Sequence, residues 1–341
     1  MDLFVDCRYG IAGDIMNAID IQPFGLGSLT YRLKNSKGMQ VVLTDFGARI
    51  VNILLPVEEN RGLRNVCLSR HSAEEYQETP YIGATVAPVA GRLFQGEITL
   101  YDRVLELAEN GPGFSLHSGP KSASMQLWQS ECDVQNNSVT FILTLADNYN
   151  GFPGPIQLSA TYCLREDNSL HVSYKGRSSQ ATIFNPTNHA FFNLTGNFME
   201  PIHDHGLQIE ADRVQYYTEQ GRFDGIHQVS QTPYDYRFEK SFGEGLGQSH
   251  PQLELLGGFD NCWLLTKPAQ TATVTSPDGK IKLHLSTNQD GLVLYTYNNN
   301  NPKLAVKQGA FSLECLASIE KSHLLEPDKT IESWACYHFD F

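Results

Sequence analysis

The chain has 341 residues, of which 41% are hydrophobic and 18% charged, and this composition is typical of folded globular proteins rather than disordered chains. Its 38 acidic residues outnumber its 25 basic ones, and the formal net charge of −13 argues against nucleic acid or an anionic membrane as the main partner. No run of about 18 or more apolar residues is present, so we expect no membrane span.

The seven cysteines are scattered along the chain, and none of them belongs to a Cys-x-x-Cys pair. Their spacing predicts neither a disulfide framework nor a zinc ribbon. The first residues carry Asp2 where a secretory signal would carry a positive charge, which argues against export. We therefore expect a cytoplasmic protein.

Residues 1–20 differ in character from the rest of the chain, and Gly10 to Asp14 lead into a segment that a short helix would fit. We predict an N-terminal extension there, to which the sequence assigns no role. Large all-β folds often run to this length as one unit, so we expect a single domain over residues 21–341.

From Leu29 onward the dominant signal is the period-two alternation of strands with one buried face. The alternating stretches include residues 138–145, 156–164, 170–174, 271–274 and 281–285. Turn residues join the second to the third and the fourth to the fifth, so each pair predicts a hairpin. Helical periodicity is scarce, with one short segment at 72–77. The pattern predicts an all-β protein, a large antiparallel β-sandwich or barrel with few short helices.

His189 lies in Asn-Pro-Thr-Asn-His-Ala-Phe-Phe-Asn-Leu-Thr-Gly at 185–196, among amides, hydroxyls and two aromatic rings. An imidazole can move a proton near neutral pH, amides and hydroxyls can bond the hydroxyl groups of a sugar, and flat rings can lie against its C–H faces. Pro186 favours a strand end or bend here rather than a helix. The alternative is a half-buried structural histidine beside two Phe.

Three further histidines stand in settings that merit attention. His117 lies in a stretch of small residues that allows a loop to approach a ligand closely, although a surface histidine would look the same. His203 and His205 are two residues apart and would share a face on a strand, as metal ligands can. They follow Pro201 without an evident third ligand, which argues against a metal site.

Three charged residues complete the set of candidates. Arg92 ends a run of small residues and can bond paired sugar hydroxyls or a carboxylate, or simply lie at the surface. Asp260 follows Gly-Gly-Phe, where a turn can point a carboxylate into a cleft, although Asp also forms turns itself. Glu314 stands inside an apolar strand, where an unpartnered charge is costly, so it needs a partner or a polar pocket. Partial burial would raise its pKa towards the range of a general base.

Five motifs together resemble the aldose 1-epimerases, also called galactose mutarotases, and they occur in that family's order from about Phe24 to the C-terminus. They are the small-residue segment ending at Arg92, Leu-His-Ser-Gly at 116–119, Thr-Asn-His-Ala-Phe-Phe-Asn-Leu at 187–194, Gly-Phe-Asp at 258–260 and Leu-Glu at 313–314. The resemblance implies a galactose mutarotase-like β-supersandwich that binds a monosaccharide and needs no metal or organic cofactor.

The resemblance also implies a reaction and a role for each residue. The enzyme would interconvert the α and β anomers of a hexose, such as galactose or glucose, or of a related aldose. Glu314 would take the proton from the C1 hydroxyl and His189 would protonate the ring oxygen. His117, Arg92 and Asp260 would bond sugar hydroxyls. General acid–base catalysis with positioning requires no further group.

Several positions depart from the family's pattern. They are Ala87-Pro88 in place of a Gly-Arg pair, Gly91 in place of asparagine, Asn261 in place of histidine, Val293 in place of glutamine, and Cys315-Leu316-Ala317 in place of a Thr-Gln continuation. Losing an amide that contacts sugar can cost about 1 kcal/mol or more if its partner stays unpaired. The departures leave the preferred aldose open, with galactose itself in question.

Two other functions stay open at this point. A non-catalytic sugar-binding or sensing protein would not need both Glu314 and His189. A glycoside hydrolase would need two carboxylates across the scissile bond, for which Asp260 and Glu314 are available. The sequence carries no signal of oligomeric state, so both a monomer and a homodimer are compatible with it.

Overall fold

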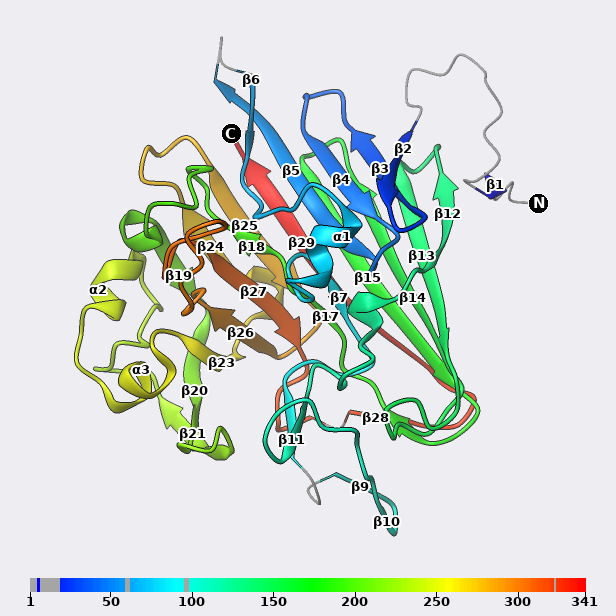
Figure 1. Ribbon diagram of the computed structural model, residues 1–341. Coiled ribbons are helices and arrows are strands. Elements are labelled where there is room, and N and C mark those ends of the chain that lie inside the picture. The colour runs from blue at the N-terminus through cyan, green and yellow to red at the C-terminus, as the bar shows by residue number, and fades with distance from the viewer. Residues whose placement is uncertain (1–4, 7–18, 59–61, 95–97, 322) are drawn as a thin grey trace.

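The computed structural model describes residues 5–6, 19–58, 62–94, 98–321 and 323–341, and its described part is built mainly of antiparallel strands (Figure 1). The largest sheet has ten strands in the order β1-β12-β13-β14-β15-β29-β25-β24-β19-β22. They are Val5–Asp6, Gln129–Asp133, Ser138–Leu145, Ile156–Leu164, Ser169–Ser178, Thr330–Asp340, Lys282–Thr287, Ala272–Thr275, Gly206–Ile209 and Lys240–Ser241.

Two smaller sheets cover the two halves of this large sheet. One has the order β2-β3-β4-β5-β6, formed by Asp20–Gly25, Ser28–Lys34, Gln40–Thr44, Arg49–Glu58 and Gly62–Asn65. The other has the order β18-β27-β26-β23-β20-β21, formed by Phe191–Phe192, Phe311–Leu316, Gly291–Tyr295, Asp260–Leu265, Ala211–Tyr217 and Phe223–Gln228. The described core joins all three sheets, so the predicted β-sandwich is confirmed.

Individual ring contacts show how the layers meet. Tyr31 of β3 packs edge-on against Phe141 of β13, with ring centroids 5.5 Å apart, which places the five-stranded sheet over the first half of the large one. Tyr337 of β29 packs against Phe192 of β18 at 5.6 Å, which places the six-stranded sheet over the other half. Burying these large side chains is the main stabilising contribution to such a sandwich.

Short elements make the connections. Four two-stranded pairs are β7 with β17, β8 with β11, β9 with β10 and β16 with β28, formed by Thr85–Val86 with Thr187–Asn188, Arg92–Phe94 with Phe114–Leu116, Thr99–Leu100 with Arg103–Val104, and Thr182–Ile183 with Leu324–Leu325. The α-helices in the described ranges are α1 (Ala73–Gln77), α2 (Phe242–Leu246) and α3 (Pro251–Leu256). The 3₁₀ turns are η1 (Ala123–Met125), η2 (Ile202–Asp204) and η3 (Pro268–Gln270).

The predicted local elements are confirmed. β14 and β15 form a hairpin in which Leu164 pairs with Leu170, and β24 and β25 form another around the turn at 276–279. That turn is closed by the bond from the Ser276 N–H to the Ile281 carbonyl. The short helix predicted at 72–77 is α1, whose first turn is capped by the Ser72 hydroxyl, which accepts from the Glu75 N–H.

Two predictions concern the N-terminus and the cysteines. The predicted extension at residues 1–20 lies outside the described residues, apart from 5–6, which pair with β12, and 19–20. Five described cysteines are free thiols and Cys132 is disulfide-bonded, a bridge that the scattered spacing did not predict.

No helix in the described ranges is long and apolar enough to cross a membrane. The expected cytoplasmic location stays a prediction.

Candidate active site

Glu314 lies in the middle of β27, and every residue of this strand is buried. β26 pairs with β27 along its whole length, and Val293 is the residue directly opposite Glu314. On the other edge, β18 pairs only with the start of β27, at Phe311 and Ser312. Glu314 is 4% exposed and lies just beyond the point where this second partner strand ends.

His189 approaches Glu314 from this open edge. It lies between β17 and β18, and its backbone is fixed on both sides, because its N–H donates to the Ala84 carbonyl and its carbonyl accepts from the Gly83 N–H. The side chain is 6% exposed, and its Nε2 lies 3.5 Å from Oε1 of Glu314. Its Nδ1 has no hydrogen-bond partner among the described residues. The structure therefore brings an imidazole and a carboxyl group together in a buried position.

His117 is the second imidazole of the site. It follows β11 with a φ of 49°, and its backbone N–H donates to the Gly91 carbonyl while its Nδ1 accepts from the Gly91 N–H. Its ring centroid lies 5.3 Å from that of His189 and 4.6 Å from that of Tyr81. Gly91 itself has a φ of 84°, which favours glycine over the asparagine expected there from the family's pattern.

Arg92 and Asp260 form an ion pair, with 3.3 Å between Nη2 and Oδ2. Arg92 opens β8 directly after the Gly91 contact with His117, and Asp260 opens β23. The turn before Asp260 requires Gly258, since a Cβ there would collide with the Asn298 side chain. Both charged side chains keep partial exposure, so their remaining polar atoms can meet a ligand.

Burial changes the charge state of these groups. It raises the pKa of Glu314 well above its usual value, and nearby Asp260 raises it further while Arg92 opposes the change. Burial lowers the pKa of His189 to about 4. The pKa of His117 is lowered well below its usual value, first by burial and then by His189 and Arg92. Burial also raises the pKa of Asp260, against the influence of Arg92.

Tyrosine side chains that the sequence reasoning did not single out complete the surroundings. Tyr81 lies near both imidazoles, with its ring centroid 6.3 Å from that of His189. Tyr295 of β26 also lies 6.3 Å from His189 by ring centroid, and it pairs across the sheet with both Ser312 and Asp260. The alternation of β26 would have placed Tyr295 on the same face as Val293, but Tyr81 stands in a loop without a periodic signal.

The structure shows the surroundings of two further residues that depart from the family's pattern, Asn261 and Val293. Asn261 is fully buried and donates to the Gln215 carbonyl at 2.9 Å, so its amide supports β20 rather than facing a ligand. Val293 lies opposite Glu314, where an apolar side chain offers no hydrogen bond.

His203 and His205 do not belong to the site. They lie in and just after η2 rather than on a strand. The Nε2 of His203 is 2.6 Å from Oε1 of Gln308, and the Nε2 of His205 accepts from the Leu194 N–H at 3.1 Å. In the part of the chain that the structure describes, no cluster of three or more potential metal ligands is found.

Comparison with known proteins decides the family. A family model described as aldose 1-epimerase matches residues 29–337, which is most of the chain. The protein belongs to the aldose 1-epimerase family. The resemblance read from the five motifs is thereby confirmed.

Relatives of this aldose 1-epimerase family member extend over nearly the same length. It is 31% identical to the aldose 1-epimerase of Haemophilus influenzae over 83% of this chain and 81% of the relative. It is 32% identical to the galactose mutarotase of Sus scrofa over 84% of this chain and 83% of the relative. The crystal structure of galactose 1-epimerase from Lactobacillus acidophilus matches with a TM-score of 0.86 and 28% identity, over 95% of this chain and 99% of that one.

Proposed function

We propose that this protein is an aldose 1-epimerase that interconverts the α and β anomers of a hexose, such as galactose or glucose, or of a related aldose. The observation that carries the proposal is the buried pair of Glu314 and His189, with 3.5 Å between Nε2 and Oε1. A carboxyl group and an imidazole at this separation can act on the two oxygens attached to one sugar carbon.

The reaction moves two protons in each direction. Glu314 takes the proton from the C1 hydroxyl while His189 gives a proton to the ring oxygen, and the bond between C1 and the ring oxygen breaks to give the open-chain aldehyde. Rotation about the C1–C2 bond presents the other face of the aldehyde. Reversal of both transfers then closes the ring to either anomer, and no covalent intermediate with the enzyme forms.

The opposed pKa changes fit this role. Glu314 and His189 share one transferable proton. It lies on Glu314 when the carboxyl group and the imidazole are both neutral, and on His189 when a carboxylate stands beside an imidazolium. Burial raises the pKa of Glu314 and lowers that of His189, so it favours the neutral pair. Sugar hydroxyls that donate to Glu314 would stabilise its carboxylate and shift the proton to His189, which creates the base and the acid together.

The remaining residues hold the sugar in place. Arg92 and Asp260 can bond neighbouring hydroxyls, because their ion pair leaves polar atoms exposed. Neutral His117 can donate through Nε2, because its Nδ1 accepts from the Gly91 N–H and the ring proton therefore lies on Nε2. Fixing the sugar in this way places its ring oxygen and C1 hydroxyl at the acid–base pair.

Polarimetry of freshly dissolved α-D-galactose and α-D-glucose tests the function, with buffer alone and the Glu314→Gln variant as controls. We expect the protein to accelerate the decay to the same final rotation and the variant to lose that acceleration. Saturable sugar binding without any acceleration would instead identify a sugar-binding protein. Release of reducing sugar from a glycoside would identify a hydrolase.

A further inference from the structure

The edge of β27 that carries Glu314 is held at two separate points. β18 pairs with Phe311 and Ser312 at the start of the strand. Beyond Ser312, no described strand pairs with this edge, whereas the opposite edge is paired with β26 as far as Leu316. Glu314 therefore lies in an interval that ordinary sheet pairing leaves free on the side of His189.

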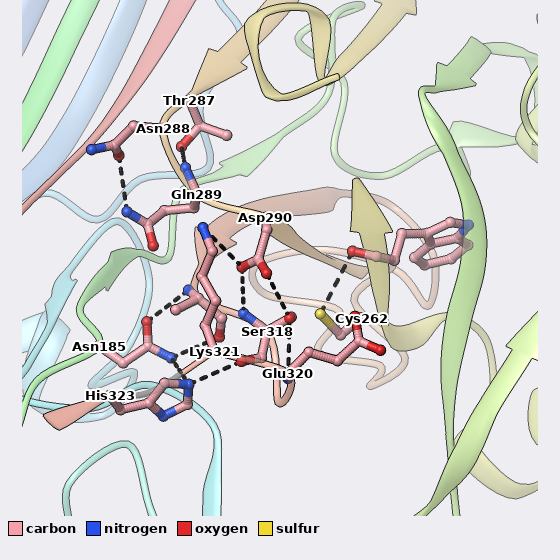
Figure 2. A network of polar contacts seen from close by, with 12 residues as sticks. Asn185, Cys262, Thr287, Asn288, Gln289, Asp290, Ser318, Glu320, Lys321 and His323 are labelled. Carbon is pink, nitrogen blue, oxygen red and sulfur yellow. Dashed lines mark hydrogen bonds and ion pairs between the residues drawn. The ribbon is translucent and has the colours of Figure 1, made fainter. Parts of the chain in front are cut away.

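The side chain of Asn185 closes this interval at its far end. Its Oδ1 accepts from the Ala317 N–H at 2.8 Å, and its Nδ2 donates to the Ala317 carbonyl at 3.0 Å (Figure 2). These two bonds imitate the reciprocal pair that a neighbouring strand would make. Asn185 is 4% exposed, so neither bond is in strong competition with water.

The backbone of Asn185 is bonded to a different segment. Its N–H donates to the Pro88 carbonyl at 2.8 Å, and its carbonyl accepts from the Ala90 N–H at 2.9 Å. That segment leads directly to Arg92, and the chain after Asn185 leads to His189. A single residue thus connects the strand that carries Glu314 with the segments that carry the other groups of the site.

The residue after Ala317 is itself held by Asp290. The Asp290 carboxylate accepts from the Ser318 N–H at 2.8 Å and from the Ser318 hydroxyl at 2.9 Å, and Lys321 lies 3.8 Å from the same carboxylate. Figure 2 shows these contacts on the loop that follows β27. The Asn185 amide therefore holds β27 against an anchored loop rather than against a free one.

We propose that Asn185 is a positioning residue that sets the separation between His189 and Glu314. The inference rests on the proposed function, because the separation matters for turnover only if this pair moves protons. Without the Asn185 side chain, the pairing of β18 with Phe311 and Ser312 is what the described strands leave on this edge of β27, and Glu314 can move away from His189. Misplacement of a reacting group by about 1 Å can lower a rate by about 100-fold.

Kinetics of Asn185→Ala and Asn185→Asp test the proposal. The Ala variant removes both bonds to Ala317, and the nearly isosteric Asp variant keeps the acceptor but loses the donor. Both keep the backbone bonds to Pro88 and Ala90. We expect kcat to fall about 10- to 100-fold with KM changed less than about 3-fold, since Arg92 and Asp260 are untouched. A raised KM with unchanged kcat would overturn the proposal.

Asn288→Ala is a matched control. Asn288 also uses its amide on the backbone, since its Oδ1 accepts from the Trp334 N–H at 2.9 Å and its Nδ2 donates to the Glu332 carbonyl at 3.2 Å. It holds β29 and touches none of the proposed site residues. We expect this variant to lose stability while kcat is kept. An equal loss of kcat in the control would reduce the Asn185 effect to general destabilisation.

A double variant and a crystal structure separate this proposal from the proposed function. In the Glu314→Gln background, Asn185→Ala should lower the residual rate less than 2-fold, because the pair it positions is already lost; a full additional loss would refute positioning. Crystal structures of the wild type and of Asn185→Ala measure the His189–Glu314 separation independently of any activity assay. Inactivity of the wild type would refute the proposed function, while an unchanged separation in Asn185→Ala would refute the positioning role.

Discussion

Replacing His189 by asparagine tests both its role in the reaction and its charge state. We expect His189→Asn to remain folded and to lose about 10²- to 10⁴-fold in kcat, the usual contribution of a positioned general acid. The same substitution should also change how stability depends on pH. The histidine has a pKa of about 4 in the folded protein against 6.5 for an ordinary histidine, so the unfolded chain binds its proton at higher pH.

The size of the second effect follows from linkage. Stability from the neutral histidine is complete above pH 6.5 and is lost as the pH falls through this value towards the folded pKa near 4. A difference of about 2.5 pKa units corresponds to about 3 kcal/mol in the free energy of unfolding. The wild type should therefore lose about 3 kcal/mol more than His189→Asn between pH 7.5 and pH 4.

Urea unfolding of both proteins from pH 4 to 8 measures this difference, and polarimetry at pH 7 measures turnover. His205→Asn is the matched control, because burial lowers the pKa of His205 to about 4 as well, while its Nε2 bonds Leu194 outside the site. The control should show the same change in pH dependence and keep its activity. Parallel stability curves for wild type and His189→Asn would show that His189 is not a buried neutral group.

Three further outcomes are expected. Glu314→Gln should lose about 10²- to 10⁴-fold in kcat by polarimetry. Because burial raises the pKa of Glu314, the wild type should lose stability as the pH rises above the ordinary carboxyl pKa, and the Gln variant should lose less. Asp260→Asn should raise KM about 10-fold while kcat falls less; a large kcat loss with normal KM would refute a binding role. Arg49→Met should lower the free energy of unfolding by about 3 kcal/mol or more in urea titrations, since the buried guanidinium donates to four backbone carbonyls; exposed Arg103→Met is the control.

The sheet content and the hairpins were predictable because they depend on neighbours in the sequence. Alternation in β14 places every second residue in the core, and a Pro-Asp-Gly turn reverses the chain between β24 and β25. The pairing of sheets was not predictable from these signals. Nothing in the residues of β3 indicates that Tyr31 meets Phe141 of β13, since such contacts depend on the final packing.

For the site, the sequence identified the residues that can carry the chemistry better than it identified which of them contact one another. Glu314 required a partner because it stands in an apolar strand, and the structure gives it His189, which is 125 positions earlier. Asn185 stands at the start of the 185–196 stretch, and nothing in its periodicity or spacing indicates the amide bonds to Ala317. Contacts across loops of this length are set by tertiary structure, so sequence patterns do not reveal them.

The interrupted pairing of β27 explains how a carboxyl group can stand inside a buried strand. Val293 lies opposite Glu314 on β26 and offers no polar group, so burial of the Glu314 charge would destabilise the fold unless the other edge supplied one. Because β18 begins at Phe191, which pairs with Ser312, the edge of β27 beyond Ser312 is open to the imidazole of His189, which lies just before β18. The raised pKa of Glu314 is the remaining cost of this arrangement. The same gap in the sheet therefore makes the buried carboxyl group tolerable and places an acid–base partner beside it.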